Sequence, residues 1–395
     1  QPVFNKNFEL LTEDIRKRLE EGYRVRIYGE KKSQLERLKS ILSQNGVGLI
    51  LALESWWHGI IASAPADNAG LMMNLVVEKM LRPKLNHEDF EALRQEELEG
   101  FGEESYISRL MKTDYQRQLN AKLDSLMGNM VYGRRLSVER TDLEALDLDR
   151  IGDFYKRLYG NPDGMTCVVC GDFDVEEMVR IAVPVFGQMT SEEPGRHGAS
   201  YFSLPEGRIV HTWPNSNETQ ATFDYVLYGR YEPSLRNGLI LKLMQNIIRG
   251  RLLSVLREEN SLVYSPYVSL FYNAVPDNVF YFDINASVDR RNTAVVYACL
   301  DEIIKDLQEK KVSVKELETL KQIFIVNKRN YLQNDATAGW KTYLVGQIKN
   351  DESLADLDEY EKILSTITPA EIRDTFRTLV NVDNHLLLSI GDFAL

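Results

Sequence analysis

The chain has 395 residues, of which 44% are hydrophobic and 27% charged, the ordinary mixture of a globular protein. Acidic residues outnumber basic ones by 59 to 47, and a net charge of −12 argues against phosphate-backbone binding, so we expect no nucleic-acid partner. The most apolar stretch, residues 46–66, is interrupted by Glu54 and His58 and lacks the roughly 20 apolar residues of a spanning helix. We expect no membrane span.

The length predicts two domains, because one ordinary domain takes about 100–200 residues. The chain begins at Gln1 without a basic and then apolar leader, which indicates a fragment or a processed product. The compartment stays open on this evidence, and we favour the bacterial periplasm over the cytoplasm.

An atypical N-terminal segment, residues 1–47, precedes the predicted domains. It predicts a helix, a strand and a second helix, over residues 10–21, 23–28 and 33–44. Residues 1–11, QPVFNKNFELL, resemble a piece of bacterial transcription-repair coupling factor, as do residues 21–23 and 34–38. The segment is interpreted as a fusion or a misassembled reading frame, or as a docking module for a repair ATPase.

Residues 48–190 predict a first α+β domain. Its expected elements are a strand ending at residues 62–63, helices over 68–81 and after the caps Asn86 and Asp147, and a strand over 165–170. Cys167 and Cys170 form a Cys-x-x-Cys pattern inside the last strand. Residues three apart in a strand point to opposite faces, so the pattern favours a buried core strand over a redox or zinc pair.

Residues 191–200 are polar and rich in turn-forming residues, and they predict a linker to a second α+β domain over residues 201–395. The expected strands and helices of this domain are 208–212, 221–228, 263–272, 278–286, 291–307 and two helices capped by Ser313 and Thr368. A long amphipathic helix has one apolar face, formed by Leu239, Ile240, Leu243, Met244, Ile247 and Ile248.

An internal repeat with a spacing of about 220 residues relates the two parts. Both contain two capped helices, with Asn86 matching Ser313 and Asp147 matching Thr368. In both, an apolar strand then ends in Gly-Asp-Phe, at residues 171–173 and 391–393. The first part lacks a counterpart of the front strands and of the long helix. The predicted fold class is α+β, with two tandem related domains that are each a mainly antiparallel sheet covered by helices.

A zinc peptidase needs two imidazoles and usually a carboxylate on the metal. The histidines are His58, His87, His197, His211 and His385. None lies three or four residues from another, so the chain has neither His-x-x-Glu-His nor His-Glu-x-x-His. Glu91 stands where a partner of His87 would have to fall, and His87 is interpreted as a first-turn helix residue. We expect no metal site and no bound cofactor.

Residues 253–265, LSVLREENSLVYS, place Arg257 near the end of the long helix and Tyr264 on the predicted next strand. With residues 132–133 and the Gly-Asp-Phe endings, this segment resembles the last domain of the pitrilysin/insulinase zinc metallopeptidases, over residues 50–395. In that family an Arg and a Tyr at this spacing reach across to the zinc site. The resemblance therefore implies that Arg257 and Tyr264 contact the substrate and stabilise the transition state in trans.

The resemblance also implies a partner. The chain would be a non-catalytic half that is inactive alone, and a homologous zinc-bearing half would supply the Zn. Together the halves would enclose an unfolded peptide, which adds to a sheet edge as an extra strand. The alternative is a catalytically inactive structural or assembly subunit with the same fold. In that case Arg257 is a solvated charge and Tyr264 an edge-strand aromatic.

Overall fold

A computed structural model describes residues 46–53, 57–100, 119, 122, 123, 126, 140–190, 203–214, 219–275, 277–334 and 336–391. The expected N-terminal segment and linker, residues 132–133 and residues 392–393 lie outside this description, apart from residues 46 and 47. The chain divides into two compact units. The first comprises Gln1–Leu98, Thr141–Cys167 and Gly171–Arg196, and the second Glu99–Arg140, Val168–Cys170 and His197–Leu395. The domain boundaries proposed from the sequence stay a prediction.

The first unit contains a two-stranded antiparallel sheet, formed by β1 (Gly48–Leu53) and β2 (His58–Ser63). The hairpin is fastened to helix α8 (Leu148–Tyr159) by two contacts. The Tyr159 hydroxyl donates to the carbonyl oxygen of Ala52 at 2.9 Å, and the His58 ring nitrogen lies 2.6 Å from the carbonyl oxygen of Leu158. One side of the hairpin is thereby held against the helices.

The other described helices of this part are η1 (Ala66–Asn68), α3 (Ala69–Leu81), α4 (His87–Gly100), α7 (Arg140–Glu144) and α9 (Val175–Phe186). Two predicted caps are confirmed. The side chain of Asn86 accepts from the backbone N–H groups of Glu88 and Asp89, and that of Asp147 accepts from Arg150. Each oxygen thus satisfies amides that the first helical turn leaves without partners.

The strand predicted over residues 165–170 is wrong. The chain there has no strand assignment, Met165 is 37% exposed, and the side chain of Cys167 is also exposed. An apolar run forms a strand only where a neighbouring strand offers its backbone groups, and no described strand of either unit pairs with these residues. Cys167 and Cys170 are free thiols.

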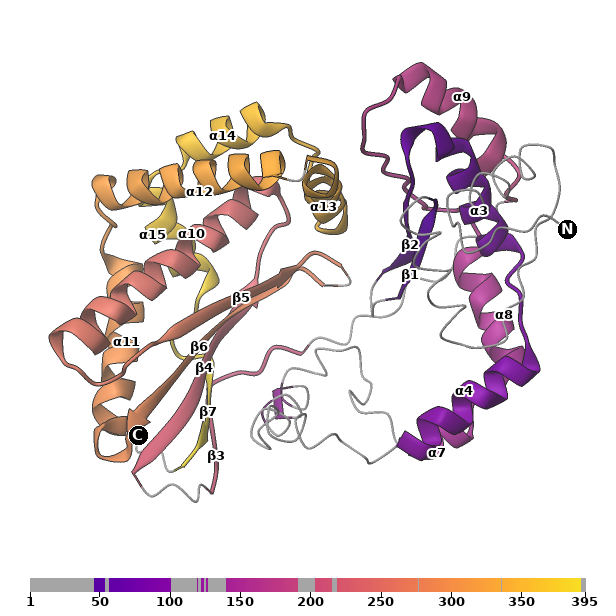
Figure 1. The fold of residues 1–395 in the computed structure, drawn as a ribbon. Helices are drawn as coiled ribbons and strands as arrows, with labels where there is room; N and C mark the ends of the chain where they lie inside the picture. Colours follow the sequence, from indigo (N-terminus) through magenta and orange to yellow (C-terminus); the bar gives the residue numbers. More distant parts are fainter. Residues whose placement is uncertain are drawn as a thin grey trace, which may run out of the picture. The chain divides into compact units, whose positions relative to one another are not determined.

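The second unit is built on a five-stranded sheet in the order β3-β7-β4-β6-β5 (Figure 1). The strands are β3 (Arg208–Trp213), β4 (Gln220–Arg230), β5 (Tyr267–Asn273), β6 (Val279–Asp289) and β7 (His385–Ile390). All neighbours are antiparallel except β3 and β7. This mainly antiparallel sheet with helices on one face is the α+β class expected from the sequence.

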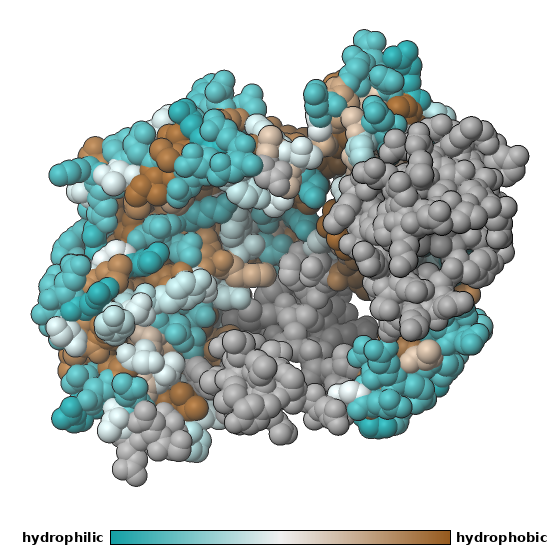
Figure 2. All heavy atoms as spheres, in the orientation of Figure 1, coloured by the Kyte–Doolittle hydropathy of each residue, from teal (hydrophilic) through white to brown (hydrophobic). Residues whose placement is uncertain are grey.

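The helices of this unit are α10 (Leu235–Leu252), η2 (Leu253–Glu259), η3 (Arg290–Asn292), α11 (Thr293–Glu309), α12 (Val314–Asn334), α13 (Ala336–Lys349), α14 (Leu357–Thr366) and α15 (Pro369–Leu379). All six residues of the predicted apolar face of α10 are at most 1% exposed and lie in the main core. The cap of α15 is a capping box between Thr368 and Glu371, with Pro369 in the first turn, as predicted. Hydrophilic side chains cover the outer surface over α14 (Figure 2).

The opposite face of this sheet is also partly covered. Val226, Tyr228, Leu386 and Leu388 form a smaller cluster there with Leu119 and Leu123. Strand residues alternate between the two faces, so Tyr225 and Leu227 face the helices while Val226 and Tyr228 face this cluster. Strands β4 and β7 therefore have buried residues on both faces.

Candidate functional site

Arg257 lies in a π-helical segment, η2, which continues α10 without a break. Tyr264 does not lie on a strand, contrary to the prediction. Strand β5 begins at Tyr267, and before it the chain makes a single bridge, between Val263 and Val288. The corner from helix to strand is therefore longer than expected, and Tyr264 lies inside it.

A reversal at Ser261 sets the shape of this corner. Ser261 has a φ of 52°, in the left-handed region that commonly ends helices. The chain then turns back, and the N–H groups of Leu262 and Val263 donate to the carbonyl oxygen of Leu256, at 2.7 and 3.2 Å. The Asn260 side chain donates to the carbonyl oxygen of Val255 at 2.7 Å. These bonds fix the backbone on both sides of the corner.

Burial alternates across the corner. Leu256 is fully buried and Val263 is 5% exposed, whereas their following neighbours, Arg257 and Tyr264, are exposed. Tyr264 is 84% exposed, and the guanidinium carbon of Arg257 lies 5.5 Å from the centre of its ring. Within the residues that the structure describes, Arg257 has no ion pair or side-chain hydrogen bond. Two buried anchors thus present a cation and a phenol to the outside.

The pair has a defined chemistry. A guanidinium offers five N–H donors in a fixed plane and stays charged at all relevant pH values. A phenol adds one O–H donor, and a cation over an aromatic ring at an exposed site gains roughly 0.5–1 kcal/mol. Such donors bind a peptide carbonyl or the oxyanion that forms from it. Arg257 and Tyr264 lie close together and are exposed, and their contact with a substrate stays a prediction.

No group of three or more His, Cys, Asp or Glu side chains that could hold a metal occurs among the described residues. His87 opens α4 and its ring lies 3.8 Å from a carboxylate oxygen of Asp149, on the surface. His385 is fully buried, where its ring contacts the Tyr297 hydroxyl and the Val382 carbonyl, each at 2.9 Å. These histidines have local structural partners.

Two carboxylates missed by the sequence analysis, Asp224 on β4 and Asp283 on β6, lie together on the sheet. Burial raises the pKa of Asp283, and its interaction with Asp224 raises it further. Asp224 is 2% exposed and accepts from the Asn285 side chain at 3.0 Å. One oxygen of Asp283 has no hydrogen-bond partner. The signal in the sequence was a lone Asp inside each of two apolar strands.

A second missed cluster surrounds Lys328 of α12. Its ammonium nitrogen lies 4.2 Å from the ring centre of Tyr343 and 5.3 Å from that of Tyr360. Burial, with repulsion from Lys242, lowers the pKa of Lys328 to about 8, and burial raises that of Glu352 to about 7. Tyr343 belongs to α13 and Tyr360 to α14. Because the two rings near Lys328 come from different helices, no sequence pattern could predict this cluster.

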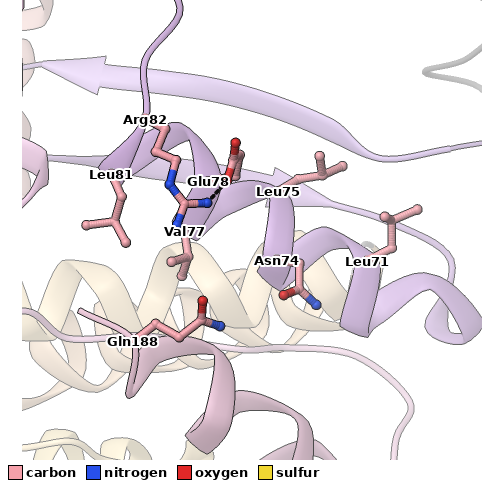
Figure 3. A pocket seen from close by; sticks show the side chains of 8 residues that line it. All are labelled: Leu71, Asn74, Leu75, Val77, Glu78, Leu81, Arg82 and Gln188. Carbon is pink, nitrogen blue, oxygen red and sulfur yellow. Dashed lines mark hydrogen bonds and ion pairs between the residues drawn. The ribbon is translucent and has the colours of Figure 1, made fainter. Parts of the chain in front are cut away.

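A separate pocket of about 260 Å³ lies in the first unit, along α3 (Figure 3). Its lining includes Leu71, Asn74 and Gln188, and Arg82 pairs with Glu78 at 2.7 Å. Both charged side chains are largely exposed, so this pair is a surface ion pair of small energetic value. The pocket brings together neither a nucleophile nor a metal-binding set.

Comparisons with known proteins relate part of the chain to one family. Residues 145–324, which include Arg257 and Tyr264, match the model of the Peptidase M16 inactive domain. No curated protein matches the chain in sequence.

Solved structures share its fold at low identity. The periplasmic protease PqqL from Escherichia coli is similar with a TM-score of 0.72 at 13% identity, over 90% of this chain and 38% of that one. A Helicobacter pylori protease gives 0.66 at 12% identity, over 90% and 84%. A Peptidase M16 inactive domain from Pseudomonas fluorescens gives 0.66 at 15% identity, over 90% and 84%. The chain therefore spans well under half of PqqL and most of the two shorter proteins. The predicted resemblance to a peptidase family is confirmed, and the resemblance of the N-terminal segment to transcription-repair coupling factor stays a prediction.

Proposed function

We propose, on the premise that residues 145–324 carry a Peptidase M16 inactive domain, that the chain is the non-catalytic half of a zinc metalloendopeptidase. The observation that carries the proposal is the outward Arg257–Tyr264 pair, held by two buried anchors inside the matched residues. Tyr264 is 84% exposed beside Arg257, so both side chains are accessible to another molecule.

The two side chains would act on a reaction centre that another polypeptide provides. Zinc, held by the other half, would polarise the peptide carbonyl and activate water. Arg257 would donate N–H groups to the carbonyl oxygen, and the Tyr264 hydroxyl would add one hydrogen bond. These donors would strengthen their contacts as negative charge develops on that oxygen, and one such donor is worth on the order of 10²–10³ in rate.

The substrate would be an unfolded peptide. Strand β5, which starts three residues after Tyr264, lies at the edge of the described sheet and Tyr267 is 62% exposed. A peptide added along this edge would run from the corner that carries Arg257, and backbone hydrogen bonds would bind it without regard to sequence. The periplasm is the proposed compartment, because the similar PqqL is a periplasmic protease.

The proposal is tested by reconstitution with a zinc-bearing M16 half that carries His-x-x-Glu-His. Turnover of an unfolded peptide should appear only when both halves are present. Arg257→Ala should lower kcat by about 100-fold with little change in the affinity between the halves. Arg249→Ala removes another exposed arginine, in α10, and should leave turnover unchanged.

Wild-type turnover with Arg257→Ala would contradict the catalytic role. The chain could instead bind a zinc-bearing half without giving it activity. That result would support a structural or assembly subunit.

A further inference from the structure

Helix α10 changes its hydrogen-bond pattern before the chain reaches the corner. Up to Leu252 the helix is an α-helix, in which each N–H donates to the carbonyl oxygen four residues earlier. Residues Leu253–Glu259 form the π-helical segment η2, in which the acceptor lies five residues earlier. Such turns are rare and occur frequently at functional sites. Arg257 lies inside η2, so the wider turn sets the direction of its side chain.

Two side-chain hydrogen bonds join residues that are five apart and therefore match the π-helical spacing. The Ser254 hydroxyl donates to a carboxylate oxygen of Glu259 at 3.0 Å. The side-chain amide of Asn260 donates to the carbonyl oxygen of Val255 at 2.7 Å. In an α-helix the residues that face each other are three or four apart, so a return to α-helical geometry would move both pairs out of alignment. Both bonds thus favour the π-helical form.

Asn260 also ends the π-helical segment. In a continued π-helix, the backbone N–H of Asn260 would donate to the carbonyl oxygen of Val255. That N–H donates to the carbonyl oxygen of Arg257 instead, and the side-chain amide of Asn260 takes its place on Val255. The Ser261 N–H donates to the same Arg257 oxygen at 3.1 Å. The side chain of Asn260 therefore lets the backbone tighten at Arg257 while the Val255 carbonyl oxygen keeps a donor.

We infer that Asn260 is a positioning residue, which holds the π-helical register of η2 and thereby places the guanidinium of Arg257 beside the Tyr264 ring. The bond between Ser254 and Glu259 supports the same register. If Arg257 contacts the reacting carbonyl group, loss of the register lowers kcat, because a displacement of about 1 Å can lower a rate by about 100-fold. This role in turnover rests on the proposed function, whereas the placement of Arg257 in the free chain does not.

The placement is measured in the full chain alone, by NMR of isotope-labelled arginine. The guanidinium carbon of Arg257 lies 5.5 Å from the centre of the Tyr264 ring, so the ring current shifts the side-chain resonances of Arg257. Tyr264→Leu gives the unshifted reference, and Asn260→Ala should move the resonances at least halfway toward it. Asn246→Ala is the matched control, because it removes an amide that donates to the Lys242 carbonyl oxygen inside the α-helical part, and it should keep the wild-type resonances.

A second pair of variants tests the register without changing Asn260, in case Asn260→Ala impairs folding. Glu259→Ala removes the acceptor of the Ser254 hydroxyl and should move the Arg257 resonances in the same direction. Glu259→Gln keeps a side-chain oxygen that can accept this bond, and it should keep the resonances near their wild-type positions.

Turnover is then measured in the enzyme reconstituted with a zinc-bearing half. Asn260→Ala should lower kcat by about 10-fold, because the displaced guanidinium contacts the carbonyl oxygen poorly, with unchanged KM and unchanged affinity between the halves. Asn246→Ala should retain the wild-type kcat. A general loss of structure would instead weaken the association of the halves.

Two results would overturn the inference. The first is that Asn260→Ala and Glu259→Ala both keep the wild-type resonances of Arg257, or that Asn246→Ala moves them equally. The second is that the resonances move in Asn260→Ala while its kcat stays at the wild-type value and Arg257→Ala lowers kcat. If Arg257→Ala itself leaves kcat unchanged, the proposed function is wrong, and the resonances alone decide whether Asn260 positions Arg257.

Discussion

The hairpin β1–β2 and the strand pair β5–β6 share a register and a place in the repeat, where residues 60–63 read IIAS and residues 284–287 read INAS, but they differ in burial. Val268 in β5 is 2% exposed, and Leu51 at the same position in β1 is 53% exposed. The strands themselves do not explain this, because both are apolar and antiparallel. In the second unit α10 and β4 lie beside β5 and β6, and the described part of the first unit has no counterpart of either element. The comparison teaches that burial in this fold depends on the covering strand and helix.

A second difference lies on the opposite face. Strand β6 carries Asp283 and Asn285 where β2 carries Gly59 and Ile61. The polar pair in β6 interacts with Asp224 of β4, the strand that has no described counterpart in the first unit. Charged groups therefore occur where a neighbouring strand supplies polar partners. The exposed Ile61 occupies a position where such a neighbour is not described.

The largest expected effect comes from placing a charge at the two equivalent positions. Val268→Lys should destabilise the second unit by about 3–5 kcal/mol, because an unpaired ammonium would be buried. Leu51→Lys should change the stability of the free chain by less than about 0.5 kcal/mol. Urea unfolding of the two variants measures the difference. A similar loss for both would show that β1 is as enclosed as β5.

A smaller effect, with a pH signature, is expected at Asp283. Burial raises the pKa of this carboxyl, so the folded state keeps its proton to higher pH than the unfolded chain. The stability from that proton is complete below the ordinary carboxyl pKa and is lost as pH rises through the raised one. Asp283→Asn should therefore be neutral near pH 4 and stabilise by about 1–3 kcal/mol at pH 9. Urea unfolding across this range checks it, and a gain independent of pH would contradict the assignment.

The smallest effect concerns the helix caps that the two units share. Thr368→Ala and Asp147→Ala should each cost about 1 kcal/mol, because each removes the acceptor for a first-turn amide. Thr378→Ala, inside α15, provides the control and should be neutral or slightly stabilising. Thermal unfolding with exchange at α8 and α15 assigns each loss to its unit. Equal losses of stability from the two substitutions would show that both units keep the same helix caps although their sheets differ.

Local signals in the sequence predicted much of this fold. The apolar face of α10, the caps at Asp147 and Thr368 and the approximate strand positions all depend on residues close together in the chain. The strand predictions were wrong where pairing with a neighbouring strand decides whether a segment forms a strand. Residues 165–170 are apolar but have no strand assignment, and β5 starts at Tyr267 because the chain first turns at Ser261.

The candidate site was predictable only in part. Arg257 and Tyr264 were found by family resemblance, and their spacing alone did not give the geometry of the corner. The Asp224–Asp283 pair depends on the register of β4 against β6. The aromatic cluster around Lys328 depends on the packing of separate helices. Neither arrangement is local in sequence, so no motif encodes it.

The most direct test of the proposed function is a double-mutant cycle on kcat in the reconstituted enzyme. Arg257→Ala and Tyr264→Phe are measured singly and together with a zinc-bearing half. Because the guanidinium lies over the phenol ring, the two should act as a unit, and the double variant should lose less than the product of the single losses. Each single substitution should lower kcat by at least about 10-fold, because each removes one hydrogen-bond donor to the oxyanion. Wild-type turnover in the double variant would contradict the account.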